Sequence, residues 1–277
     1  MFYLFNMAKV SVIIPTYNSE RFIERTIKTV LAQTFQGWEM IIVDDCSSDR
    51  TKDIVKDYER KDKRIKGVFL DRNSGGPSYP TNVGVNSSGG EYIALLDHDD
   101  EWLPDKIEKQ MLILENKPDV GIVSCDCVIK NDDGKEIGIR DNVNHVNVLH
   151  DELFCNFVFG CSSVLIRKNV FDAVEGFDEK CRVSQDWEFY IRVFEDGFGF
   201  DFVPERLFIS HPVLKSSQWK GISYLKRAEE MKYILDKHRK LFLDDSVAFK
   251  NRLRRLGGLY IFSRKYIAGL KYLFKSL

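Results

Sequence analysis

Long hydrophobic runs are missing from this chain of 277 residues. No apolar stretch reaches the roughly 18–20 residues that a membrane-spanning helix needs. Met1–Val10 is too short and too weakly charged for a secretory signal peptide. These absences predict a cytoplasmic protein that has no helix through a membrane.

The chain also lacks the cysteine spacings of a zinc knuckle, and at its size it does not need disulfide bonds to hold its fold. We therefore expect reduced thiols that are mostly buried. Cys125 and Cys127 alternate along a predicted strand, so we assign them a structural role. The other four cysteines are Cys46, Cys155, Cys161 and Cys181.

Acidic residues are absent from Ser246 to the end of the chain, although the net charge of the whole is only −1. From Gly221 onward the sequence holds 14 Lys or Arg against 5 Asp or Glu, so the part before it is acidic overall. An acidic body argues against nucleic acid as its main ligand. The basic tail is a candidate for binding an anionic surface.

Strands and helices alternate through the first hundred residues. Apolar, β-branched runs predict four buried strands, and segments with helical periodicity or capping residues separate them. This order is typical of right-handed βαβ units around a parallel sheet, and predicts an α/β fold with helices on the sheet. The predicted strands are Val10–Ile14, Trp38–Val43, Ile65–Leu70 and Tyr92–Leu96.

Beyond residue 105 the pattern is less regular. After a helix at Asp105–Asn116, the sequence predicts a hairpin over Val120–Ile139, with a turn at 131–134. A buried strand at Ser163–Arg167 and a helix that opens near Ser184 follow. Two short strands at 200–204 and 207–210 precede a helical, amphipathic end from about Tyr224.

Each predicted strand of the first half is followed by a polar loop. These loops are Thr16–Asn18, Asp44–Asp45, Asn73–Ser78 and Asp97–Asp100. Ligands of open α/β sheets bind at the carboxyl ends of the strands. We therefore expect the four loops to meet at one crevice.

Three carboxylates stand within four residues in the last of these loops, at Asp97, Asp99 and Asp100. They repel one another, and burying them unpaired costs several kcal/mol each. A hard divalent cation, held together with substrate phosphates, is the natural partner. If the strand continues, Asp97 and Asp99 share a face and His98 points elsewhere. The alternative is that Asp99 or Asp100 caps a following helix.

Five motifs in this order resemble the family-2 inverting nucleotide-sugar glycosyltransferases, which have the GT-A fold. The resemblance covers about residues 8 to 217. It implies a Rossmann-like, mostly parallel sheet flanked by helices, followed by a C-terminal helical appendage. The motifs are Val10–Asn18; Ile41–Thr51; Asn73-x-Gly75 with Asn82-x-Gly84; Gly90–Asp100 with Trp102 and Pro104; and Gly176–Asp178 with Gln185–Trp187.

The resemblance also implies roles for individual residues. Asp186 is the catalytic base, although an Asp before Trp187 could also be a plain helix N-cap. Asp99 is the direct metal ligand, and Asp97 contacts the metal or the ribose. The resemblance places Pro15, Tyr17 and Asp45 at the base of the nucleotide-sugar donor. It places these further residues at the donor: Thr16, Asn18, Asn73, Gly75, Asn82, Asp97 and His98.

Three further positions bear on the predicted site. His211 follows a predicted strand and is a candidate for contacting the metal or the diphosphate, with a structural role as the alternative. Thr81 stands where many family members have Arg, in a loop extended by Gly76–Pro80. Gln185 stands where an acidic residue often precedes the base. The last two departures put the choice of donor in doubt more than the activity.

These inferences together predict a glycosyltransferase that depends on Mn²⁺ or Mg²⁺ and inverts the sugar carbon. It would move a sugar from a UDP-sugar to a hydroxyl of a glycan or lipid-linked acceptor during synthesis of envelope or surface polysaccharide. The catalytic domain spans 1–220, with a nucleotide-sugar half at about 8–104 and an acceptor half at about 105–220. The tail spans 221–277.

Two other functions fit the sequence less well. A sugar nucleotidyltransferase would need a Gly-rich, basic loop after the first strand, whereas this chain has Pro15–Asn18 there. A non-catalytic scaffold that binds nucleotide-sugar at the membrane has no reason to keep Asp97, Asp99 and Asp186 together.

Two interpretations of the tail stay open. A basic amphipathic helix suits a membrane surface, here the inner face. Alternatively, the helices pack on the catalytic domain or on another subunit of a homo-oligomer. The apolar positions are Leu253, Leu256, Tyr260, Ile261, Ala268, Leu270, Leu273 and Phe274, and the basic ones are Arg252, Arg254, Arg255, Arg264, Lys265, Lys271 and Lys275.

Overall fold

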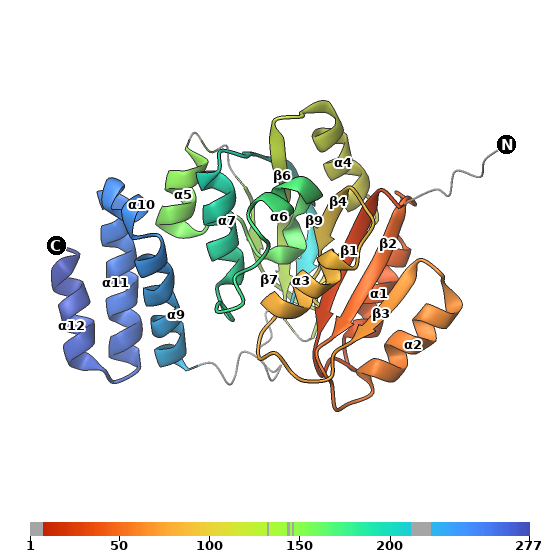
Figure 1. Cartoon of the computed structure of the whole chain (residues 1–277), viewed down its shortest axis with the longest axis horizontal. Coiled ribbons are helices and arrows are strands. Elements are labelled where there is room, and N and C mark those ends of the chain that lie inside the picture. The colour runs from red at the N-terminus through yellow and green to blue at the C-terminus, as the bar shows by residue number, and fades with distance from the viewer. Residues whose placement is uncertain (1–7, 132, 143–144, 146, 212–222) are drawn as a thin grey trace.

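A central sheet organises the part of the molecule before the C-terminal helices (Figure 1). The computed structural model describes residues 8–131, 133–142, 145, 147–211 and 223–277. In these residues the sheet has nine strands: β1 (Val10–Thr16), β2 (Trp38–Asp44), β3 (Ile65–Phe69), β4 (Tyr92–Leu95), β5 (Glu101–Trp102), β6 (Val120–Lys130), β7 (Glu136–Arg140), β8 (Leu165–Arg167) and β9 (Gly199–Ser210).

The strand order is β3-β2-β1-β4-β8-β6-β9-β5, with β7 paired to β6 beside this path. The first four strands are all parallel. The predicted parallel half is therefore confirmed, and its carboxyl ends share one edge. The second half adds antiparallel pairs of β8 with β4 and β6, and the predicted hairpin is the antiparallel pair β6–β7. Asp132, in the predicted turn, lies outside the described residues.

Helices cover both faces of the sheet and form the C-terminal end of the molecule (Figure 1). Helix α3 begins at Ser78, and Pro80 is tolerated because it lies in the first helical turn. The helices are α1 (Ile23–Leu31), α2 (Thr51–Lys61), α3 (Ser78–Asn86), α4 (Lys106–Asn116), α5 (Val148–Cys155), α6 (Lys168–Ala173), α7 (Gln185–Glu195), α9 (Tyr224–Lys237), α10 (Arg239–Asp244), α11 (Ser246–Phe262) and α12 (Tyr266–Lys275).

Alternate residues of β1 face opposite helical layers, because side chains of a strand point to the two faces of the sheet in turn. Val12 and Ile14 belong to the core with α1 and α4, whereas Ile13 belongs to the core with α3, α6 and α7. Both faces are buried, which explains why the strand has an almost uninterrupted apolar sequence.

The two strands predicted at 200–204 and 207–210 are one strand, β9. Its parallel pairing with β6 shifts register around Cys125 to Cys127, and a shift of this kind absorbs the interruption in the sequence pattern. All six cysteines are free thiols. Four of them are buried, as predicted, and Cys46 and Cys155 are exposed.

The tail packs on the part of the molecule that carries the sheet, through α9 and α11. Leu253 and Leu256 join a core with Trp187 of α7. Arg252 is buried, donates through Nε to Leu153 O (2.6 Å), and places its guanidinium 3.9 Å from the Trp187 ring centre. Part of the predicted basic amphipathic surface is therefore interior. No described helix is both long and apolar enough to cross a membrane.

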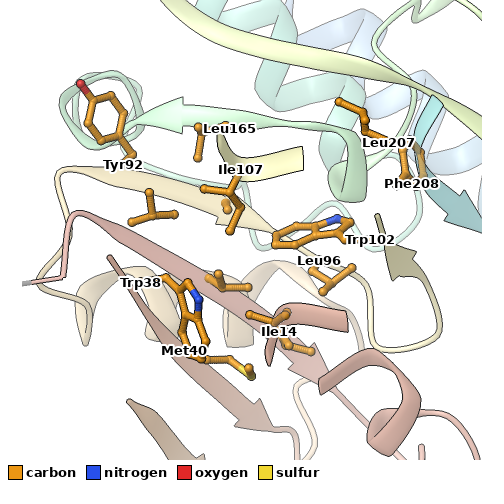
Figure 2. Packing of buried hydrophobic residues seen from close by; sticks show 14 of the residues in the cluster. Ile14, Trp38, Met40, Tyr92, Leu96, Trp102, Ile107, Leu165, Leu207 and Phe208 are labelled. Carbon is orange, nitrogen blue, oxygen red and sulfur yellow. The ribbon is translucent and has the colours of Figure 1, made fainter. Parts of the chain in front are cut away.

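A buried apolar layer supports the loop that follows β4. Figure 2 shows the Trp102 ring beside Leu96, with Leu207 and Phe208 close by, and all four belong to one core. Trp102 also donates its indole N–H to Ser162 O (2.8 Å). The acidic loop between Leu96 and Trp102 is thus fixed at both ends by burial.

Candidate active site

A cavity of about 260 Å³ opens at the edge where the parallel strands end. It is formed by the loops after β1, β2, β3 and β4 and by the segment that leads into α7. The predicted meeting of the polar loops is therefore observed. Nine predicted site residues line the cavity: Pro15, Thr16, Tyr17, Asp45, Asn73, Gly75, Asp97, His98 and Asp99.

Asp45 joins the second loop to the third. Its carboxylate accepts hydrogen bonds from Ser74 N (2.9 Å), Ser74 Oγ (2.9 Å) and Asn73 Nδ2 (3.0 Å). Burial raises the pKa of Asp45, and the bonds from Ser74 oppose this shift. Two loops that are distant in the sequence thus form one wall of the cavity.

The acidic segment after β4 is a turn, closed by a bond from Asp100 N to Asp97 O (3.1 Å). Strand β4 ends at Leu95, so the strand alternation that would separate His98 from Asp97 and Asp99 does not extend to them, and all three residues line the cavity. The interpretation of Asp99 or Asp100 as a helix cap was wrong, since Glu101 begins β5.

Side chains of helix α1 hold the backbone of this turn. Thr26 Oγ1 donates to His98 O (2.8 Å) and to Asp100 O (2.9 Å), and Arg25 Nη2 donates to Asp99 O (2.7 Å). On the other side, Ser162 Oγ accepts from Asp97 N (3.0 Å). These bonds fix the backbone of the turn, from which Asp97 and Asp99 line the cavity.

The carboxylates around the turn share an excess of negative charge. Burial, together with the charges of Asp100, Asp99 and Asp186, raises the pKa of Asp97 well above its usual range. Burial and Asp99 raise the pKa of Asp100 to about 7, against opposing hydrogen bonds from Ser162 and from His211 N. Such a field fits a bound cation.

The chemistry of the donor set agrees with a hard divalent ion. Asp97 and Asp99 offer carboxylate oxygens at one cavity. Within the described residues, no group of three or more His, Cys, Asp or Glu side chains is placed to hold a metal. An ion at this turn would therefore need oxygens from a substrate, as Mg²⁺ commonly does when it binds with phosphates.

Asp186 lies in the first turn of α7, next to the cavity. The helix begins at Gln185 with Ser184 as its N-cap residue, so Asp186 is not the N-cap, although its Oδ1 accepts from Trp187 N (2.8 Å). Burial raises the pKa of Asp186 to about 6. Gln185 lines the cavity itself, and its buried Oε1 has no hydrogen-bond partner among the described residues.

Besides Asp186, three predicted site residues do not line the cavity. Asn18 braces the loop after β2, because its Oδ1 accepts from Ser48 N (2.8 Å). Asn82 pairs with the Phe177 backbone through both ends of its amide (2.9 Å each). His211 donates its backbone N–H to Asp100 Oδ1 (2.9 Å), and its Nε2 lies 2.7 Å from Glu101 Oε1.

Arg182 lines the cavity and was missed by the sequence analysis. It is the one Lys or Arg among the described lining residues. Its guanidinium covers Gly75, where an added Cβ would come within 3.2 Å of Nη1. The only signal in the sequence was a basic residue shortly before Gln185. Such a signal has no meaning until the fold brings Arg182 across to the loop after β3.

The segment that carries Arg182 is held by the tail. Glu230 of α9 accepts hydrogen bonds from Arg182 N (2.8 Å), Val183 N (2.9 Å) and Ser184 N (2.6 Å). These are the three residues directly before α7, so one carboxylate fixes the approach to both Gln185 and Asp186. The tail thus contributes to the geometry of the site although it does not line it.

Comparison with known proteins shows the family of this chain. The model of glycosyl transferase family 2 matches residues 11–174, more than half of the chain. The chain belongs to this family. As a family-2 member it is an enzyme, a glycosyltransferase, and the predicted resemblance is confirmed.

Two relatives illustrate the family. TuaG of Bacillus subtilis, a glycosyltransferase named for teichuronic acid biosynthesis, is 35% identical over 192 residues, which cover 68% of this chain and 73% of TuaG. TarS of Staphylococcus aureus, a poly(ribitol-phosphate) β-N-acetylglucosaminyltransferase, is 43% identical over 96 residues, which cover 34% of this chain and 17% of TarS.

Solved structures confirm the GT-A fold of this family-2 enzyme. The crystal structure of S. aureus TarS 1–349 in complex with UDP matches with a TM-score of 0.70 at 22% identity, over 93% of this chain and 73% of that one. The mannosyltransferase PcManGT from Pyrobaculum calidifontis, in complex with GDP-Man and Mn²⁺, matches with a TM-score of 0.67 at 16% identity, over 98% and 75% of the two chains.

Proposed function

We propose that this glycosyltransferase moves a sugar from a UDP-sugar to a hydroxyl group of an envelope glycan or lipid-linked acceptor, with inversion at the sugar carbon. The observation that carries the proposal is the cavity that joins Asp45, the acidic turn at Asp97–Asp99 and the start of α7. TarS structures with UDP and with UDP-GlcNAc, and relatives named for teichuronic acid and poly(ribitol-phosphate), support the donor and acceptor classes.

Asp186 acts as the general base. The acceptor oxygen attacks the sugar carbon, Asp186 takes its proton, and the bond from that carbon to the nucleotide diphosphate breaks. A pKa of about 6 keeps this carboxylate mostly ionised at neutral pH, yet basic enough to accept a proton. One base and no protein nucleophile give single displacement, and therefore inversion, as in inverting glycosidases.

The leaving diphosphate needs positive charge beside it. Asp97 and Asp99 would hold Mn²⁺ or Mg²⁺, which when bound supplies Lewis-acid neutralisation of the leaving group. Arg182 contributes a second, fixed charge at the same cavity. Many family members have Arg at the position of Thr81, which cannot supply a positive charge. In this chain Arg182 provides a guanidinium at the cavity instead.

The walls of the cavity fix the remaining parts of the donor. Pro15, Tyr17 and Asp45 lie together at the ends of β1 and β2, where they would hold the base of the nucleotide. Asn18 and Asn82 act on this site only indirectly, by holding the neighbouring loops. His211 supports Asp100, which leaves Asp97 and Asp99 as the metal ligands.

The proposal is tested by screening nucleotide-sugars for thermal stabilisation of the full chain with and without Mn²⁺. A donor at about one hundred times its Kd should raise the melting temperature by about 5–10 °C. EDTA should remove most of this shift, and slow release of UDP should accompany it. If GDP-sugars stabilise and UDP-sugars do not, the donor assignment is wrong. If no nucleotide-sugar stabilises the protein with Mn²⁺, the metal-dependent mechanism fails.

Replacing Glu230 should impair transfer without unfolding the protein. Glu230→Ala removes the acceptor of three backbone N–H groups before α7. Small displacements of a reacting group are costly, so we expect kcat to fall about 10-fold. Glu230→Gln keeps one carbonyl oxygen that can accept these bonds, so its kcat should fall less than that of Glu230→Ala.

The matched control for Glu230 is Glu229→Ala, because Glu229 is exposed on the same helix. Its kcat should equal that of the wild type. Melting temperatures of all variants separate a local effect from general destabilisation. A Glu230→Ala enzyme with normal kcat would show that the tail does not position the site.

A further inference from the structure

Helix α12 is the outermost element of the tail (Figure 1). It packs against α11 through one side only. A Cβ added at Gly269 would come within 2.6 Å of Ile261 Cγ1, and the rings of Tyr260 and Tyr272 stack at 5.5 Å. This close packing fixes which side of α12 faces away from the molecule.

The outward side of α12 is apolar. Ile267 is 88% exposed, Phe274 is 70% exposed and Leu277 is 81% exposed. Ile267, Leu270 and Phe274 are spaced by three and four residues, so they lie on one face of α12; Leu277 follows just beyond the end of the helix. An exposed apolar surface of this kind marks a binding site more often than chance. We call this surface the α12 face, consisting of Tyr266, Ile267, Leu270, Phe274 and Leu277.

The charged side chains on α12 and directly before it are all basic. Lys271 and Lys275 flank it on the helix, and Arg264 and Lys265 precede it, all four being exposed. From Ser246 to the end of the chain there is no Asp or Glu. The partner of this surface must therefore combine an apolar interior with a negatively charged boundary.

A second copy of the chain fits this surface poorly. In a two-fold symmetric contact the same patch meets itself. Two α12 faces would then bring Lys271 and Lys275 close to their own counterparts, with no carboxylate in either helix to neutralise them. Like charges across an interface oppose association.

We propose that the α12 face binds the surface of a membrane that contains anionic phospholipid. The apolar residues enter the boundary between headgroups and acyl chains, and the flanking lysines meet the lipid phosphates. The helix lies in the plane of the membrane. The rest of the tail, with Arg252 and Leu256 buried against α5 and α7, rigidly connects this face to the catalytic part of the molecule.

Vesicle co-sedimentation of the full chain tests this proposal without any measurement of transfer. The protein should sediment with vesicles of phosphatidylcholine and phosphatidylglycerol, but not with phosphatidylcholine alone, and high salt should weaken binding. Phe274→Glu and the double change Lys271→Glu and Lys275→Glu should each reduce the bound fraction at least about 10-fold.

Two controls match these variants. Leu112→Glu changes an exposed leucine of α4 in the catalytic part, and Lys226→Glu changes an exposed lysine of α9. Both should bind vesicles like the wild type, and circular dichroism should show all variants folded. Three results overturn the proposal: no sedimentation with anionic vesicles at low salt, unchanged binding by Phe274→Glu, or a dimer in solution that Phe274→Glu dissociates while vesicles never bind.

Discussion

Asp186→Asn should lower kcat for sugar transfer by about 10²–10⁴-fold, the range typical of losing a general base. The amide has nearly the shape of the carboxylate and still offers an oxygen to Trp187 N, which is 2.8 Å from Oδ1. It cannot take the proton of the acceptor hydroxyl. Donor affinity, measured by titration of the donor with Mn²⁺, should remain unchanged because Asp186 does not line the donor cavity.

The dependence of kcat/KM on pH provides a second readout for Asp186. The base acts when it is deprotonated, and burial raises its pKa to about 6. Transfer by the wild type should therefore fall as pH drops through about 6, and the residual activity of Asp186→Asn should lose this step. Asp196→Asn, an exposed change at the end of the same helix, is the control. Full activity of Asp186→Asn would exclude Asp186 as the base.

The parallel half of the sheet was predictable because its signals are local. The apolar run of β1 and the polar residues after each strand follow from burial and from the edge at which parallel strands end. Asp45, Asp97 and Asp99 could be named from these rules and the family motifs. Their convergence at one cavity followed from topology alone.

What the sequence could not show depends on contacts between distant segments. Asn82 carries a family motif, yet its amide pairs with Phe177, which comes 95 residues later. Arg182 lines the cavity, and its backbone is held by Glu230, which comes 48 residues later in the tail. Arg252 looked like a surface charge, and its burial over Trp187 becomes visible only when α11 docks on α7. Such pairings between distant segments leave no periodic pattern in the sequence from which they could be predicted.

Asp99→Asn should reduce transfer at least about 100-fold at a fixed Mn²⁺ concentration. Asp99 lines the cavity beside Asp97, and its backbone is held in place by Arg25 (2.7 Å). The amide keeps the side-chain volume but removes the charge that attracts a divalent ion. Metal-assisted neutralisation of a leaving group amounts to several kcal/mol, and each 1.36 kcal/mol corresponds to about tenfold in rate.

The loss of transfer activity in Asp99→Asn should differ in kind from the loss in Asp186→Asn. In Asp99→Asn the apparent affinity for Mn²⁺ should weaken together with transfer. This affinity is measured from the thermal stabilisation that UDP gives at increasing metal concentration. Excess Mn²⁺ should restore part of the transfer rate. Asp71→Asn alters an exposed carboxylate in the loop after β3 and should leave both quantities unchanged. If Asp99→Asn keeps the affinity for Mn²⁺ but loses transfer, then Asp99 acts on the sugar or ribose, and the metal depends on Asp97.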